Sequence, residues 1–179
     1  FENSSYASVS QCAYSGTITT SGTGAFINLG GIVGIAGTIS NCTTSGAINM
    51  AGGRMENVGG IAGRVYSSTT NCISNMSITL NSNANKYGIS NIQYVGGLVG
   101  NGVTITNCTT NGTITASASN SFDSYYAQIN YVGGLVGTAY TISSSSASGA
   151  INIKSGKSAQ YVGGIAGYLR NGVNKSYST

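Results

Sequence analysis

Two short blocks decide the fold of this chain: Val95-Gly96-Gly97-Leu98-Val99-Gly100, and the segment Asn107-Cys108-Thr109-Thr110-Asn111-Gly112-Thr113-Ile114-Thr115 that follows it. The glycine-rich block occurs five times, with 29, 37, 37 and 30 residues between successive starts, at Leu29, Val58, Val95, Val132 and Val162. Copies of the Asn-Cys block begin at Gln11, Asn41, Asn71, Asn107 and Ser144. Two linked blocks that recur in this way indicate a stack of repeated structural units.

The Asn-Cys block alternates between two kinds of side chain. Every second residue from the cysteine gives Cys108, Thr110, Gly112 and Ile114, whereas the residues between them are Asn or Thr throughout. A period of two predicts a β-strand with an inner and an outer face. No stretch shows a helical period over ten or more positions, so we expect essentially no helix.

A repeat this short cannot bury its own apolar face and must stack on its neighbours. We therefore predict an all-β chain, a parallel β-solenoid (β-helix) of about five rungs, in which equivalent residues form ladders. One ladder contains Ile18, Ile48, Ile78, Ile114 and Ile151, and another contains Ile32, Ile61, Leu98, Leu135 and Ile165. The glycine block is semi-apolar on both faces, which leaves two interpretations: its glycines bend the strand, or its outer face packs against something.

Composition narrows the classes of function. Charged residues make up 6% of the chain, hydrophobic residues 40%, and Pro and His are absent. The seven Lys and Arg residues are scattered, which argues against a nucleic-acid partner because no basic stripe forms. No apolar run reaches the length of a membrane span, so we expect no membrane insertion.

The glycine block resembles the GLUG motif, named for its Gly-Leu-(any)-Gly core. That family of repeats occurs in large secreted and cell-surface proteins and is thought to form β-solenoids. The resemblance covers nearly the whole chain. It implies an extracellular or cell-surface location and says little about activity.

Side chains suited to catalysis are few and dispersed. The carboxylates are Glu2, Glu56 and Asp123, which lie rungs apart, and without His a Ser or Cys nucleophile lacks its usual base. We therefore expect a protein that is not an enzyme and that uses no metal or cofactor.

The cysteines recur at one motif position, at Cys12, Cys42, Cys72 and Cys108, with Ser145 and Lys175 there in later repeats. We interpret them as a stacked column of buried thiols that points into the core. Disulfides between adjacent rungs are the alternative.

Two longer connections provide a candidate binding surface. The chain takes 17 and 18 residues from Ile78 and Ile114 to the next glycine block, against 10 or 11 elsewhere. We expect residues 81–93 and 116–130 to lie side by side as the largest protrusion, because insertions at one edge of a solenoid often form its binding face. The tentative binding residues are Tyr87, Phe122, Tyr125 and Tyr126. A separate column precedes three glycine blocks and consists of Tyr94, Tyr131 and Tyr161. Two interpretations stay open: these tyrosines bind a glycan or a protein, or they only cover the core.

Asn-x-Ser/Thr sequences mark candidate glycosylation sites at Asn3, Asn41, Asn75, Asn107, Asn111 and Asn174. We align Asn41, Asn107 and Asn174 at one outward motif position. Solvent-facing asparagine without a glycan is the alternative.

These features favour a non-catalytic structural or adhesive surface protein, a stalk or fibre segment. We expect residues 1–179 to form a single repeat array that is an excerpt of a longer region or associates end to end, because Asn174-Lys175-Ser176 begins a sixth rung and neither end carries a cap. The first alternative is a module that binds carbohydrate or a host-surface protein through its tyrosine-bearing corner. The second is ice binding by outward threonines in Thr17-Ile18-Thr19 and Thr113-Ile114-Thr115.

Overall fold

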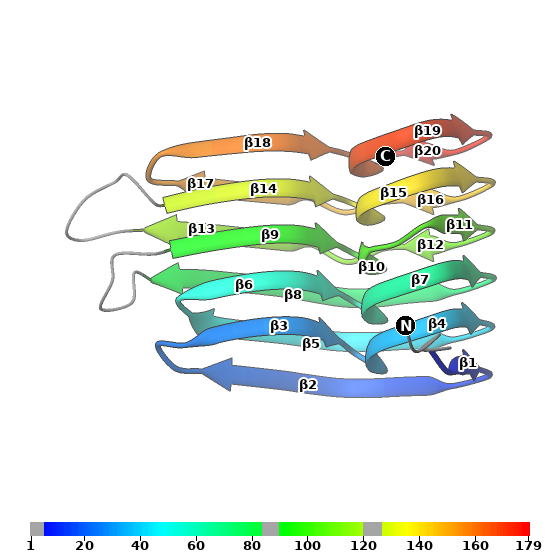
Figure 1. Ribbon diagram of the computed structural model, residues 1–179, viewed down its shortest axis with the longest axis horizontal. Coiled ribbons are helices and arrows are strands. Elements are labelled where there is room, and N and C mark those ends of the chain that lie inside the picture. Colours follow the sequence, from blue (N-terminus) through cyan, green and yellow to red (C-terminus); the bar gives the residue numbers. More distant parts are fainter. Residues whose placement is uncertain (1–5, 84–89, 120–126) are drawn as a thin grey trace, which may run out of the picture.

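The computed structural model describes residues 6–83, 90–119 and 127–179, and within these ranges every element is a β-strand (Figure 1). The strands form three parallel sheets, which we call A, B and C, and the chain visits them in that order on every turn. The protein is therefore a parallel β-solenoid, as the repeat predicts.

Sheet A contains β1 (Ser8–Ser10), β4 (Val33–Ser40), β7 (Ala62–Thr70), β10 (Val99–Asn101), β11 (Thr104–Thr106), β15 (Val136–Ser143) and β19 (Ala166–Asn174). Sheet B contains β2 (Ala13–Ser21), β5 (Thr43–Gly52), β8 (Ile73–Asn83), β12 (Thr109–Thr110), β13 (Ile114–Ser119), β16 (Ser146–Ala147), β17 (Ile151–Ser155) and β20 (Tyr177–Ser178). Sheet C contains β3 (Ala25–Gly30), β6 (Arg54–Gly59), β9 (Ser90–Gly96), β14 (Ala127–Gly133) and β18 (Ser158–Gly163).

The three sheets make a flattened coil with two faces. Sheets C and A lie end to end along one face, and sheet B covers the other (Figure 1). The chain runs from sheet C to sheet A across the front and returns through sheet B behind as it rises, which makes the coil right-handed. This is the hand that right-twisted parallel strands favour.

The pairing between rungs is in register, as predicted. Ile48 pairs with Ile18 and Ile78, and Ile114 pairs with Ile78 and Ile151. The glycine blocks join likewise, with backbone N–H groups of Ile61 and Leu98 donating to Leu98 and Leu135 carbonyls at 2.9 Å. Every rung therefore repeats the same inner and outer positions.

Sheet B shows the predicted alternation most clearly. In β8, Ser74, Met76, Ile78 and Leu80 are fully buried, whereas Ile73 is 44% exposed. Because strand side chains alternate between faces, one face of this sheet is core and the other is solvent.

The glycine blocks curl the chain from sheet C into sheet A, so the first of the two interpretations is correct. A Cβ on Gly97 would collide with the Gly134 carbonyl oxygen of the next rung and lie 3.2 Å from Thr110 Cβ of sheet B. A Cβ on Gly100 would lie 2.6 Å from the Tyr94 carbonyl oxygen, on the other side of the curl. Backbone meets backbone at these positions, and there is no space for a side chain.

The curl divides the interior into two hydrophobic cores. The core under sheet A includes Ile39, Ile61, Leu98, Ile105 and the buried cysteines. The core under sheet C includes Met55, Ile78, Leu80, Ile92 and Ile129. The small side chains Thr44, Ser74 and Thr110 of sheet B face the Gly-Gly pairs between the two cores.

The C-terminal register differs from the sequence alignment by one residue. Asn174 pairs with Ser143, and Tyr177 pairs with Ser146, so Lys175 lies level with Ser144 and Asn41, and Ser176 with the cysteines. Backbone angles agree, because φ is 47° at Lys175, 48° at Ser144 and 53° at Asn41. Placing Asn174 with Asn41 and Lys175 with the cysteines was wrong, because the corner conformation and not the Asn-x-Ser pattern sets the register.

Candidate functional site

Three tyrosines occupy a strained backbone position at the end of sheet C. Tyr94, Tyr131 and Tyr161 have φ of 57°, 58° and 56°, the left-handed region in which the chain enters the curl. The same position holds Asn28 and Asn57 in the first two rungs, at 59° and 53°. Asparagine adopts this conformation readily, whereas for an aromatic residue its conformational energy is higher. Strain of this kind tends to persist where a side chain has a role.

The tyrosine rings form a continuous stack along the solenoid axis. Ring centroids are 5.0 Å apart for Tyr94 and Tyr131 and 4.8 Å apart for Tyr131 and Tyr161, with the planes within 10°. Tyr168 contacts the edges of this stack, 6.2 Å from Tyr131 and 6.1 Å from Tyr161. The column that the sequence suggested is therefore formed, with the spacing of the rungs.

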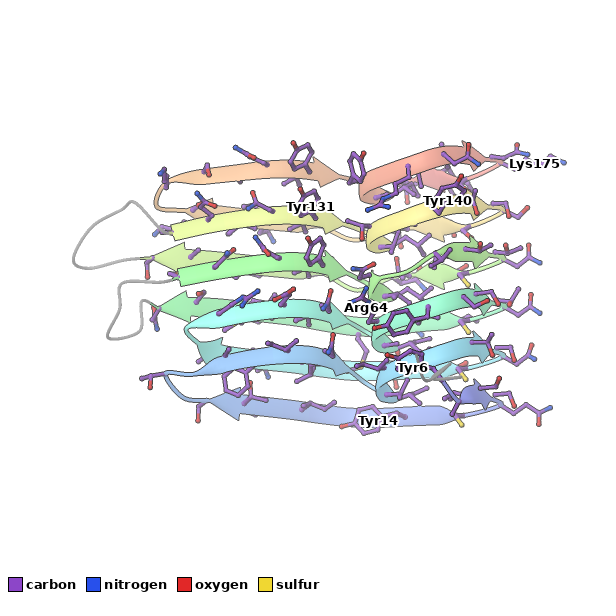
Figure 2. All side chains as sticks on the ribbon, in the orientation of Figure 1. Tyr6, Tyr14, Arg64, Tyr131, Tyr140 and Lys175 are labelled. Atoms are coloured by element: carbon purple, nitrogen blue, oxygen red, sulfur yellow. The ribbon has the colours of Figure 1, made fainter. Side chains whose placement is uncertain are left out.

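The stack forms one wall of a groove of about 620 Å³ on the front face. Sheet A supplies the rest, with Asn101, Gly102, Val103, Thr138, Ala139 and Tyr140. Figure 2 labels Tyr131 on the left side of this region and Tyr140 on the right. Tyr161 and Tyr140 are each 51% exposed, so the groove is open to solvent.

Arginines stand at the two ends of the groove, Arg64 on β7 and Arg170 on β19. The Arg64 guanidinium carbon lies 4.6 Å from the centre of the Tyr66 ring, in a cation–π contact. The Tyr6 ring stacks on the Tyr66 ring, with their centroids 4.1 Å apart. Figure 2 labels Arg64 and Tyr6, which lie close together in this view. Arg64 is thus held in place by the aromatic ring beside it.

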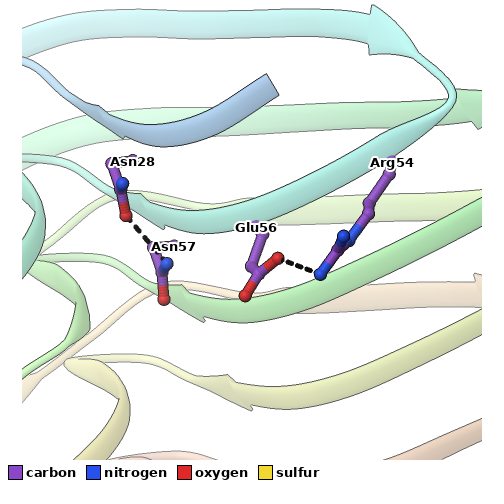
Figure 3. A network of polar contacts seen from close by, with 4 residues as sticks. All are labelled: Asn28, Arg54, Glu56 and Asn57. Carbon is purple, nitrogen blue, oxygen red and sulfur yellow. Dashed lines mark hydrogen bonds and ion pairs between the residues drawn. The ribbon is translucent and has the colours of Figure 1, made fainter. Parts of the chain in front are cut away.

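Among the residues that the structure describes, no carboxylate lines the groove. Within the described ranges Glu56 is the carboxylate side chain, and it forms an ion pair with Arg54 on β6 (Figure 3). Beside that pair, Asn57 Nδ2 donates to Asn28 Oδ1 at 2.8 Å. Burial raises the pKa of Tyr131, so its hydroxyl keeps its proton and can donate. The groove therefore presents cations and hydrogen-bond donors without a compensating anion.

The cysteines form the predicted column under sheet A. Cys42, Cys72 and Cys108 are fully buried and free, and Cys12 is half-buried. The Cys42 N–H donates to Cys72 Sγ at 3.5 Å, and two rung steps further along the Cys108 N–H donates to Ser145 Oγ at 3.1 Å. Cys72 Sγ and Ser145 Oγ thus accept hydrogen bonds from backbone N–H groups of the neighbouring rungs.

The thiols of this column differ in pKa. Burial raises the pKa of Cys42, and the hydrogen bond with Cys72 together with burial raises that of Cys108. The hydrogen bond with Cys108 lowers the pKa of Cys72 to about 7, but Cys72 is fully buried, so reagents in solution do not reach its sulfur. The described residues contain no group of three or more His, Cys, Asp or Glu side chains that could hold a metal ion.

The proposed corner site falls on residues outside the described ranges. Tyr87, Phe122, Tyr125 and Tyr126 are among them, and so is Asn3. The flanks of the two connections do lie side by side, since Asn81 to Asn83 pair with residues 117–119, and residues 90–93 pair with 127–130.

The remaining candidate glycosylation asparagines are all exposed: Asn41, Asn75, Asn107, Asn111 and Asn174. Asn41 and Asn107 sit at the corner between sheets A and B, each with φ of 53°. Asn111 Nδ2, the atom that would carry a glycan, donates to Asn75 Oδ1 at 2.8 Å. The corner conformation is by itself a sufficient reason for asparagine at Asn41 and Asn107.

Comparison with known proteins adds no relative. No family model matches the chain, and neither a curated protein nor a solved structure matches it significantly. The similarity of the glycine blocks to GLUG repeats stays a prediction. Among the described residues, no helix is long and apolar enough to cross a membrane.

Arg64, Tyr140, Tyr168 and Arg170 were not selected as site residues from the sequence. Arg64 and Tyr168 directly follow the last glycine of their blocks, a position equivalent to Asn101 and Thr138. That shared position was visible in the repeat. Its closeness to the tyrosine column was not, because it depends on how tightly the curl brings sheet A to the end of sheet C.

Proposed function

We propose that this chain is a non-catalytic structural segment of an extracellular or cell-surface protein, a stiff shaft that spaces or displays other parts. The observation that carries the proposal is the parallel pairing of all three sheets from rung to rung, which is in register except where sheet A shifts after Ala36 and after Ala139. Each added rung buries the apolar face of the one before, so stiffness and stability accumulate with length.

The outer surfaces suit such a shaft. The outer face of sheet B carries small uncharged side chains in columns, such as Ser15, Ser45, Asn75, Asn111 and Ser148. Hydrogen bonds connect neighbours within this column, from Ser45 to Ser15 at 3.0 Å and from Ser148 to Asn111 at 2.9 Å. Ladders of this kind join neighbouring rungs through their side chains and so stiffen the sheet.

The edge strands offer a route to longer assemblies. Val162 on β18 and Val173 on β19 are 45% and 54% exposed at one end of the stack. Edge strands carry unpaired backbone groups and readily pair with another strand. Rungs from flanking sequence or from a second copy would cover both the backbone edge and these valines.

A second candidate function, a binding module, is favoured by the tyrosine-lined groove. A concave surface with a few converging polar groups is the usual form of a ligand site. A shaft can carry such a site along its length, so the two functions are compatible.

The shaft proposal is tested on cells of the source organism. Antibodies raised against the purified chain should label intact, unpermeabilised cells, and electron microscopy with the same antibodies should place the label on fibrous surface material. Labelling that appears only after permeabilisation would refute an extracellular shaft. Labelling of compact particles instead of extended material would refute its structural role.

A further inference from the structure

We propose that the groove between the tyrosine stack and sheet A binds an acidic oligosaccharide, a sugar chain bearing carboxylate or sulfate groups. The inference deepens the binding-module candidate and does not depend on the shaft function. It places the site on the front face and not at the corner loops.

The charge of the groove selects for an anion. Arg64 and Arg170 stand at its two ends, and the carboxylate of Glu56 is engaged by Arg54 on a different part of sheet C. Guanidinium groups form paired hydrogen bonds with carboxylate, sulfate or phosphate oxygens. The two arginines lie three rung steps apart, roughly 14 Å along the axis, so an extended ligand with more than one anionic group fits better than a single small ion.

The neutral groups of the groove suit a ligand rich in hydroxyls. Tyr131, Tyr140, Asn101 and Thr138 add phenol, amide and alcohol groups between the arginines. Each can donate as well as accept a hydrogen bond. Tyrosine also presents an apolar ring next to its polar end, which matches the mixed surface of a sugar ring.

The geometry of the stack argues against single-stranded nucleic acid. Bases bind by stacking on open aromatic faces. A flat group inserted between two rings needs about 7 Å between them, twice a van der Waals contact, whereas the ring centroids here are 5.0 and 4.8 Å apart. The stack is therefore closed to intercalation.

The direction of the groove argues against an acidic peptide bound as an added strand. The groove runs along the solenoid axis, across β7, β10, β15 and β19. Between β7 and β19 these strands are already paired with one another. The free edge of β19 runs across the end of the groove, so a peptide strand added there would extend the sheet and would not lie in the groove.

Binding is tested by titrating the full chain with three oligosaccharides of equal length: an oligogalacturonate, a sulfated glycosaminoglycan fragment and a neutral cello-oligosaccharide. Calorimetry measures the affinity at low and at moderate salt. We expect one or both acidic chains to bind more weakly as salt rises, and the neutral chain not to bind. The carboxylate and sulfate arms show which anion is the natural type.

Variants locate the site. Arg64→Gln combined with Arg170→Gln should weaken binding by at least about tenfold, since each arginine loses a charge-assisted hydrogen bond. Lys154→Gln removes a unit of charge from the outer face of sheet B and should leave binding unchanged, and thermal unfolding confirms that both variants are folded. Tyr131→Phe, which keeps the ring stack and removes one hydroxyl, should weaken binding by a smaller factor.

The proposal is overturned if neither acidic oligosaccharide binds, if the neutral chain binds as tightly, or if Lys154→Gln weakens binding as much as the double arginine variant. It is also overturned if oligoglutamate or a single-stranded oligonucleotide binds more tightly than either acidic sugar with the same dependence on the two arginines. None of these results bears on surface labelling or fibre formation, so the shaft function is tested independently.

Discussion

The isoleucine ladder of sheet B allows a graded test of the stacked core. Ile78 lies at the middle of the ladder and is fully buried, paired with Ile48 and Ile114 on its two sides. Ile151 is near one end and is half-buried. Replacing each by alanine removes the same atoms from two different depths of one column.

The expected cost follows from burial. Loss of three carbon groups at about 0.8 kcal/mol each gives about 2.4 kcal/mol for Ile78→Ala. Neighbouring rungs are fixed by their backbone pairing and can close the cavity only in part, which raises the total to ~4 kcal/mol. Ile151→Ala should cost about half as much or less, because water and nearby side chains reach the space.

Urea denaturation followed by circular dichroism measures both changes in the free energy of unfolding. Ser77→Ala, at the neighbouring outward position of the same strand, is the matched control and should change it by no more than about 0.5 kcal/mol. Equal losses at Ile78 and Ile151, or a loss at Ile78 no larger than the control, would refute the reasoning that the rungs stack on a rigid shared core.

Three further predictions concern the curl and the thiols. Gly97→Ala should prevent folding or lower the melting temperature sharply, because its methyl group would meet the Gly134 backbone, whereas Gly24→Ala, with open space around it, should be neutral in the same melting assay. Cys72→Ser should fold with little loss, since Ser145 already occupies this position and accepts a backbone hydrogen bond, whereas Cys72→Ala leaves the Cys42 N–H unpaired and should cost about 1–3 kcal/mol by urea denaturation. The free energy of unfolding should fall as the pH rises above about 8.5, because the thiols of Cys42 and Cys108, whose pKa values are raised in the folded state, ionise in the unfolded chain first; this stabilisation is complete below the unfolded pKa and is lost above it. Cys72, whose pKa is lowered to about 7 in the folded state, contributes in the opposite direction, but its contribution stops growing once the unfolded thiol has ionised, so the fall dominates at higher pH. The Cys42→Ser, Cys72→Ser, Cys108→Ser triple variant should lose the dependence. A flat profile for the parent chain between pH 8 and 10 would contradict the last of these.

Ladders and faces were predictable because they depend on local alternation repeated at a fixed period. Cys72, Met76 and Ile78 share a parity in the sequence, and strand geometry places residues of one parity on one face. The burial of the cysteine column follows from the same rule. The predicted register was wrong at Asn174 and Lys175, where the alignment relied on residue type. The corner residue with left-handed backbone angles can be Asn, Ser or Lys, so residue type does not identify it.

The groove was only half predictable. Tyr94, Tyr131 and Tyr161 share a motif position, so a column could be expected from the repeat. Nothing local indicated that Arg64, Tyr140 and Arg170 lie across from it, because these residues follow the glycine block and belong to another sheet. The tentative corner residues Tyr87, Phe122, Tyr125 and Tyr126 stay a prediction.

The sequence by itself determined a parallel solenoid without helix, its inner and outer faces and the residues of each ladder, because a period of two inside a repeated block leaves one way to bury the apolar side chains. Tertiary structure alone decided the right-handed coil, the two cores and the groove. The two cores and the groove depend on the curl at Gly-Gly, where backbone packs against backbone across neighbouring rungs. The direction in which the chain leaves the curl is set by how the three sheets pack against one another, and the sequence of a single repeat does not specify this packing.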